Sequence, residues 1–146
     1  MTLDDLRRFF RAAPFVADLG VEPVAFADGR LATGLTVGPR HLQHTGSVHA
    51  GVMATMADHS MGIAAQALLG EDRWILTAEL KTSLLRPAIG QRLHCEAWVL
   101  KPGRSLCFTE AEVWAEAEGR RTLVMKASAT MAVVAADRLA TTPERT

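Results

Sequence analysis

Asp58 is the residue whose type and position most clearly suggest chemistry. Its neighbours at helical spacing are uncharged, and residues 42–72 contain no lysine or arginine. A carboxylate in such surroundings loses hydration, which costs several kcal/mol unless its pKa rises. We therefore interpret Asp58 as a general base or nucleophile that burial keeps ready for reaction. A structural carboxylate that reaches solvent or a tertiary hydrogen bond is the alternative.

The segment Gly46–Gly51 precedes Asp58 and contains the start of the same predicted helix. The first N–H groups of a helix lack partners and carry the positive end of the helix dipole. Such groups stabilise the negative oxygen that develops when a carbonyl carbon is attacked. Every helix has such an end, so this feature gains meaning only in combination with Asp58.

The spacing between these two features predicts a dimer. Ala50 and Asp58 are eight residues apart, which corresponds to about 12 Å along a helix. An attacking group and an oxyanion donor must both lie within about 3 Å of one reacting carbon. One copy of the helix cannot supply both groups, whereas two antiparallel copies related by a two-fold axis can.

Histidines, methionines and cysteines offer other chemistry. The histidines around Asp58 match no compact zinc motif, so we expect neither a metal nor a cofactor. Methionines of the predicted helix can line an apolar pocket, but core packing explains them equally well.

We expect Cys95 to lie opposite Ala111, about 13 Å along the strand from Cys107. This exceeds the roughly 7 Å between Cα atoms that a disulfide tolerates, so both cysteines are expected to be buried thiols.

The elements that must position Asp58 follow from hydrophobic periodicity. An amphipathic helix is expected within residues 1–18. A second helix is expected over residues 47–69, with Thr45 or Ser47 as its cap. This second helix is apolar on almost all sides, so we expect it to be buried. One strand precedes this central helix and four follow it, separated by Gly- or Pro-containing turns that favour antiparallel neighbours; the strands are 31–37, 74–85, 92–100, 106–117 and 122–134. The predicted fold class is α+β, with an antiparallel sheet wrapped around one long central helix.

Length, charge and composition set the remaining limits. The 146 residues suit a single domain spanning 1–146, in which we expect residues 136–146 to form a mobile tail. Sixteen basic and sixteen acidic side chains give no net charge, so neither nucleic acid nor an anionic membrane is an expected partner. Charges interrupt the N-terminal segment and no apolar run reaches about 18 residues, so a cytoplasmic location is the default expectation.

Residues 43–51 read Gln-His-Thr-Gly-Ser-Val-His-Ala-Gly and are followed by Asp58. This segment resembles the signature of the phenylacetyl-CoA thioesterase-like family of hotdog-fold proteins, in which Asn or Gln precedes a His-Gly-Gly sequence and a later acidic residue. Segments 76–80, 85–88 and 101–106 are similar to further landmarks of the family. The resemblance covers roughly residues 21–134. It implies a hotdog fold and hydrolysis of an acyl-CoA by a homodimer or a dimer of dimers.

The resemblance also implies roles for individual residues. Asp58 falls on the catalytic acidic position, and Gln43 falls on the position that orients the thioester or the water. The backbone N–H of Ala50 would polarise the thioester carbonyl, and Thr77 would position the water or the acidic side chain. Ala50 stands where the family has glycine, which keeps the N–H but adds a methyl group that narrows the site. Strand alternation alone leaves open whether Thr77 faces the helix.

Five further residues are candidates for substrate binding. His49 and Gly51 belong to the start of the predicted helix, where His49 is expected to support the helix end through hydrogen bonds. Arg86, Lys101 and Arg104 lie in turns at strand ends and can meet the phosphates of coenzyme A. Ordinary solvated turn charges are the alternative for these three residues.

The leading hypothesis is hydrolysis of an acyl-CoA thioester. A non-catalytic acyl-CoA-binding or scaffold protein with the same fold is the alternative, although a pure binder has no use for a buried carboxylate. The acyl group, the choice between dimer and tetramer, and the choice between a covalent anhydride and direct water attack stay open at this stage.

Overall fold

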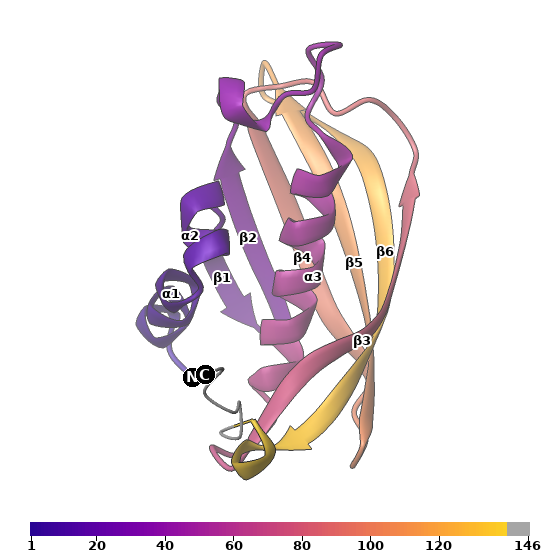
Figure 1. Cartoon of the computed structure of the whole chain (residues 1–146). Helices are drawn as coiled ribbons and strands as arrows, with labels where there is room; N and C mark the ends of the chain where they lie inside the picture. The colour runs from indigo at the N-terminus through magenta and orange to yellow at the C-terminus, as the bar shows by residue number, and fades with distance from the viewer. Residues whose placement is uncertain (140–146) are drawn as a thin grey trace, which may run out of the picture.

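The computed structural model describes residues 1–139. Two short helices begin the chain, a hairpin follows, and one long helix precedes four strands (Figure 1). In chain order the elements are α1 (Leu3–Ala12), α2 (Pro14–Leu19), β1 (Glu22–Ala27), β2 (Arg30–Thr36), the 3₁₀ turn η1 (Pro39–His41), α3 (Ala50–Gln66), β3 (Arg73–Leu84), β4 (Arg92–Lys101), β5 (Leu106–Ala117), β6 (Arg120–Ala135) and the 3₁₀ turn η2 (Ala136–Arg138).

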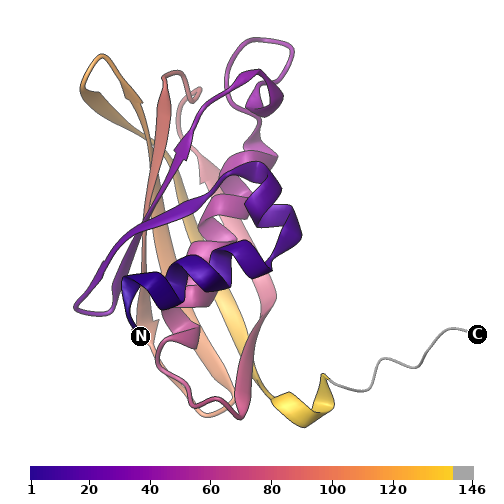
Figure 2. The same cartoon turned by 90° about the vertical axis from the view of Figure 1, so that its left-hand side faces the viewer.

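The strands form one six-stranded antiparallel sheet in the order β1-β2-β4-β5-β6-β3. The sheet curves around α3, while α1 lies against β1 and α2 contacts α3 (Figures 1 and 2). This architecture confirms the predicted hotdog fold.

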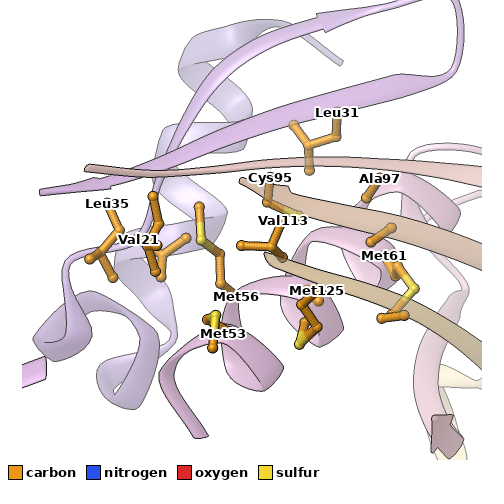
Figure 3. Packing of buried hydrophobic residues seen from close by; sticks show 14 of the residues in the cluster. Val21, Leu31, Leu35, Met53, Met56, Met61, Cys95, Ala97, Val113 and Met125 are labelled. Atoms are coloured by element: carbon orange, nitrogen blue, oxygen red, sulfur yellow. The ribbon is translucent and has the colours of Figure 1, made fainter. Parts of the chain in front are cut away.

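The hydrophobic core lies between α3 and the inner face of the sheet (Figure 3). Met56 and Met61 are fully buried there, against strand residues such as Val113 and Met125. These two methionines therefore fill the core, as flexible thioether side chains do where packing is irregular. A polar pair also lies within it, because the hydroxyl groups of Thr33 and Ser60 are 2.9 Å apart and satisfy each other.

The N-terminal segment forms two helices where the sequence predicted one. Pro14 lacks an N–H group and would break an i to i−4 hydrogen bond inside a helix, but it is favoured at the first helical position. The chain accordingly leaves the helical conformation at Ala13, and α2 begins at Pro14.

The central helix begins at Ala50, three residues later than predicted, and the predicted caps Thr45 and Ser47 are wrong. The N–H of Gln43 donates to the carbonyl of Ser47 at 2.9 Å, which closes a turn before the helix can start. His49 is the N-cap. The helix ends at Gln66, whereas 69 was predicted.

Two features of the sheet differ from the prediction. Strand β1 was not predicted; it is short and contains Pro23, beside which the pairing register shifts. Strands β3 and β4 are not neighbours, because their connection crosses the start of α3, where the N–H of Val48 donates to the carbonyl of Ala88 at 2.9 Å. Strand β3 therefore pairs with β6, and β4 pairs with β2 and β5.

The two cysteines are buried free thiols, as predicted. The expected register is wrong, however, because Cys95 lies opposite Val113 rather than Ala111. Cys107 is therefore six residues from the position opposite Cys95, or roughly 20 Å along the strand. Burial raises the pKa of Cys95 to about 12, so its thiol stays protonated.

The predicted tail begins with ordered structure, since residues 136–138 form η2 and the N–H of Ala136 donates to the carbonyl of Asp72 at 2.9 Å. The remainder of that prediction, residues 140–146, lies outside the described residues. Within residues 1–139, none of the helices combines the length and apolar character needed to cross a membrane. The cytoplasmic location stays a prediction.

Candidate active site

Asp58 and Thr77 meet across the helix and the edge strand. Asp58 is half-buried in the middle of α3, and the hydroxyl of Thr77 on β3 donates a 2.7 Å hydrogen bond to its Oδ1 atom. Both residues line a cleft of about 380 Å³ between α1, α3 and β3, which we call the Asp58 cleft. One carboxylate oxygen is thereby held in place, and the other is left for a substrate or a water molecule.

A β-bulge turns Thr77 toward the helix. Thr77 lies opposite Met131, and Glu79 lies opposite Thr130, so Ala78 is an extra residue on β3. Bulges commonly re-aim a side chain next to a functional site. The bulge places Thr77 on the same side of the sheet as buried Met131, and Leu80 beyond it shares that side through its pairing with buried Ala129. Strand alternation left the orientation of Thr77 open, and it would have grouped Thr77 with Glu79; the bulge instead places the two on opposite faces of the sheet.

The start of α3 exposes one backbone donor. The N–H of Gly51 donates to Nδ1 of His49 at 2.8 Å, and the N–H of Val52 donates to the His49 carbonyl at 3.0 Å. In the described part of the chain, the N–H of Ala50 has no acceptor. Ala50 is the first residue of the helix, so this free N–H lies at the positive end of the helix dipole.

Gln43 and Arg86 lie beside this helix start. They line a second cleft, of about 720 Å³, together with His49 and Ala50; we call it the helix-start cleft. The Gln43 side-chain amide donates to the Ser47 hydroxyl at 2.7 Å, which holds the amide in the turn before α3. The Arg86 guanidinium donates one hydrogen bond to the carbonyl of Leu123 at 2.9 Å. Its other N–H groups can donate to a ligand.

The candidate residues therefore gather in two groups that one chain does not bring together. Asp58 and Thr77 form one group, and Gln43, Ala50 and His49 form the other. The helix between the groups is uninterrupted, so about 12 Å still separates Ala50 from Asp58. Gly51 is exposed at the helix start, and its N–H is already used by His49.

Lys101 and Arg104 lie far from Arg86. The antiparallel pairings place the end of β4 and the start of β3 at the same end of the sheet, with β5 and β6 between them, whereas Arg86 follows the end of β3. Lys101 and Arg104 are exposed at the end of the sheet that Arg86 does not occupy, and neither lines the two clefts.

Three residues that the sequence did not single out for the active site also line the Asp58 cleft: His59, Phe9 and Trp74. The His59 ring packs edge-on against Phe10 with 4.5 Å between ring centroids. Burial lowers the pKa of His59, although the neighbouring Asp58 acts in the opposite direction. The whole chain has only five Phe and three Trp residues and no Tyr, so their scarcity was the available signal.

The described residues contain no group of three or more His, Cys, Asp or Glu side chains placed to hold a metal ion.

Comparisons with known proteins agree with this architecture. The family model of the Thioesterase superfamily matches residues 45–122, and the chain belongs to this family. A thioesterase family protein from Silicibacter pomeroyi is 31% identical in sequence and superimposes with a TM-score of 0.86, covering 90% of this chain and 97% of that one.

Two curated relatives are similar in sequence. Human acyl-coenzyme A thioesterase 13 is 28% identical over 119 residues, which cover 79% of this chain and 83% of the relative. A Caenorhabditis elegans protein named as a putative esterase is 32% identical over 101 residues, or 68% of this chain; the match spans only 59% of that relative's length.

Proposed function

We propose that this protein hydrolyses acyl-CoA thioesters at sites shared between the two subunits of a homodimer. Membership in the Thioesterase superfamily supports thioester hydrolysis in general. The similarity to an acyl-coenzyme A thioesterase supports coenzyme A as the leaving group. The observation that carries the shared site is the separation, on one unbroken helix, of the Asp58 carboxylate from the free N–H of Ala50.

In the proposed reaction, Asp58 of one subunit acts on a thioester whose carbonyl oxygen accepts a hydrogen bond from Ala50 N–H of the other. In one route, Asp58 takes a proton from water while the water oxygen bonds to the carbonyl carbon. In the other route, the Asp58 carboxylate itself attacks the carbonyl carbon and forms an anhydride, which water then hydrolyses. The carbon–sulfur bond then breaks, and the thiolate of coenzyme A takes up the proton. Thr77 fixes the carboxylate orientation, and Gln43 orients the thioester or the water.

The edge strand β3 supports this dimer. It forms one end of the sheet order, so one side of its backbone has unpaired N–H and C=O groups. Large apolar side chains are exposed along it, with Leu76 and Leu84 at 46% and 54% exposure. An antiparallel β3–β3 pairing would cover these side chains and bring the start of each α3 toward the middle of the other.

The same arrangement bears on the coenzyme A phosphates. Arg86 lies at one end of the sheet, and Lys101 and Arg104 lie at the other. In an antiparallel dimer, Arg86 of one subunit would therefore lie at the same end as Lys101 and Arg104 of the other. We propose that these basic side chains meet the phosphates from both subunits.

Thiol release from a panel of acyl-CoA substrates tests the proposed function. The wild-type protein should release coenzyme A thiol, and the isosteric change Asp58→Asn should remove nearly all turnover with the fold intact by circular dichroism. Equilibrium binding of acyl-CoA without thiol release would instead favour a binding protein. An Asp58→Asn variant that keeps most of its kcat would contradict the assigned role.

A further inference from the structure

The Asp58 cleft continues beyond the carboxylate as an apolar space. Its walls come from three elements: Phe9 and Ala12 on α1, Gly62 and Ile63 on α3, and Ile75 on β3. Asp58 is the only Asp, Glu, Lys or Arg among the described residues that line it. A space with one charged end and apolar walls suits a ligand with a reactive polar head and an apolar body.

Two aromatic rings mark the far end of this space. Phe9 and Trp74 meet edge-on, with 6.4 Å between ring centroids and 66° between ring planes. Both also line the adjoining groove of about 590 Å³, whose walls include the charged residues Arg8, Glu71 and Arg73. The aromatic pair therefore stands where apolar surroundings give way to charged ones.

Gln66 fixes the backbone on both sides of Trp74. Its side-chain N–H donates to the Arg73 carbonyl, and its side-chain oxygen accepts from the Ile75 N–H, both at 2.9 Å. Gln66 is buried at the end of α3. The position of the Trp74 backbone is thus set by the same helix that carries Asp58.

The length of the space follows from these positions. Trp74 is three residues from Thr77, or about 10 Å along the strand. Gln66 is eight residues from Asp58, or about 12 Å along the helix. A cavity of about 150 Å³ suffices to hold benzene, so the Asp58 cleft has room for an aromatic ring or a medium-length chain.

We propose that the acyl group of the thioester occupies the Asp58 cleft and that Phe9 and Trp74 limit its length. This inference rests on the proposed function. With the carbonyl at Asp58, an aryl or medium-length acyl group ends before the aromatic pair. An extended palmitoyl chain is longer than the space and would have to displace the rings into the charged groove.

The first test enlarges the far end. Phe9→Ala and Trp74→Ala are assayed with benzoyl-, octanoyl- and palmitoyl-CoA by thiol release. Wild-type protein should prefer the first two substrates, and each variant should raise the palmitoyl-to-octanoyl ratio of kcat/KM by roughly tenfold or more. Phe15→Ala is the matched control, because Phe15 lies on α2, is 68% exposed and does not line the cleft.

The second test fills the cleft. A Cβ atom at Gly62 would meet no heavy atom within 4 Å, and Gly62 lines the cleft, so Gly62→Leu places a larger side chain at this wall. It should lower kcat/KM for octanoyl-CoA by about tenfold or more, and by more than it lowers kcat/KM for acetyl-CoA. This variant does not depend on whether Trp74→Ala folds.

The outcomes separate the two proposals. Turnover with an unchanged acyl preference in Phe9→Ala and Gly62→Leu would overturn the length limit and leave the proposed function standing. If no acyl-CoA releases thiol, the proposed function fails, and calorimetric binding of octanoyl-CoA still tests the cleft. Weaker binding by Gly62→Leu, with coenzyme A itself bound as before, would support acyl occupancy; equal binding of octanoyl-CoA by both proteins would exclude it.

Discussion

The hydroxyl of Thr77 lies 2.7 Å from Oδ1 of Asp58, although the two residues come from different elements and are 19 positions apart. The contact depends on the extra residue Ala78, which rotates this part of β3 so that Thr77 faces α3. A hydrogen bond from a neutral donor to a carboxylate is stronger than one between neutral groups. It also restricts the carboxylate to one orientation.

Removing this hydrogen bond should reduce turnover. Hydrogen bonds to charged groups contribute about 1.5–3 kcal/mol, so Thr77→Val should lower kcat by about ten- to a hundredfold with a smaller effect on KM. Thr77→Ser keeps the hydroxyl and should retain most activity. Steady-state thiol release measures both variants, and equal kcat values for Val and Thr at this position would exclude an orienting role.

Ala50→Pro should remove the backbone N–H that we propose as the oxyanion donor, while leaving the helix and its stability nearly unchanged. Proline is favoured at the first helical position and lacks the N–H, and His49 before it already has the extended backbone, φ −63° and ψ 137°, that proline requires of its predecessor. We expect kcat to fall by about 10²–10³, with the thermal midpoint nearly unchanged. Ala50→Gly is the control and should remain active. Full activity in the proline variant would remove Ala50 from the site.

Hybrid dimers test whether the sites are shared. Asp58→Ala and Gln43→Ala homodimers should each be inactive, but a hybrid of the two has one intact site when these residues act from different subunits. Random mixing in equal amounts should restore about a quarter of the wild-type activity. Subunit exchange is checked by mass spectrometry of differently tagged chains, and exchanged hybrids without activity would argue against shared sites.

His59 should make stability depend on pH. Burial lowers its pKa below the ordinary value of 6.5, so between the folded and unfolded pKa values the unfolded chain binds more protons. The free energy of unfolding should therefore be fully maintained above about pH 6.5 and decrease as the pH falls below it. Urea titrations at several pH values should show a smaller decrease for His59→Phe. A residual decrease is expected from His94, whose pKa burial also lowers.

An exposed histidine provides the control for this experiment. His44→Phe lies in an exposed loop position and should leave the pH profile as in wild type. Identical profiles for wild type and His59→Phe would show that His59 is not a source of the pH dependence.

Gly62→Ala should stabilise the protein. Glycine inside a helix is destabilising by about 0.5–1 kcal/mol relative to alanine, and nothing lies within 4 Å of the added Cβ. Gly51→Ala is the matched comparison on the same helix, because its Cβ would lie 3.0 Å from Nδ1 of His49 and press on the N-cap. Chemical denaturation should show a gain for the first variant and a smaller gain or a loss for the second.

The central helix and its carboxylate were predictable because both depend on local sequence. A long run of alanine, methionine and leucine without proline indicates a buried helix, and the absence of nearby cations singles out Asp58. The start of that helix was misplaced because the turn at Gln43 depends on hydrogen bonds that composition does not reveal. The proline break at Ala13 could have been predicted from the residues alone.

The orientation of Thr77 and the pairing of β3 depend on long-range structure. A bulge adds one residue to one strand, and nothing in the sequence around Ala78 marks it. The connection from β3 to β4 is short enough for a hairpin, yet it crosses the start of α3 and joins strands that are not neighbours. Contacts with residues far along the chain decide both features.

The crossing of the β3–β4 connection over the start of α3 affects how a substrate is positioned. The hydrogen bond from Val48 N–H to the Ala88 carbonyl ties the loop that carries Arg86 directly to the residues that lead into Ala50. A ligand bound by Arg86 would therefore be positioned by the same loop contact that positions the Ala50 amide. Recognition of one end of a substrate and polarisation of its reactive bond would then depend on one contact between two loops.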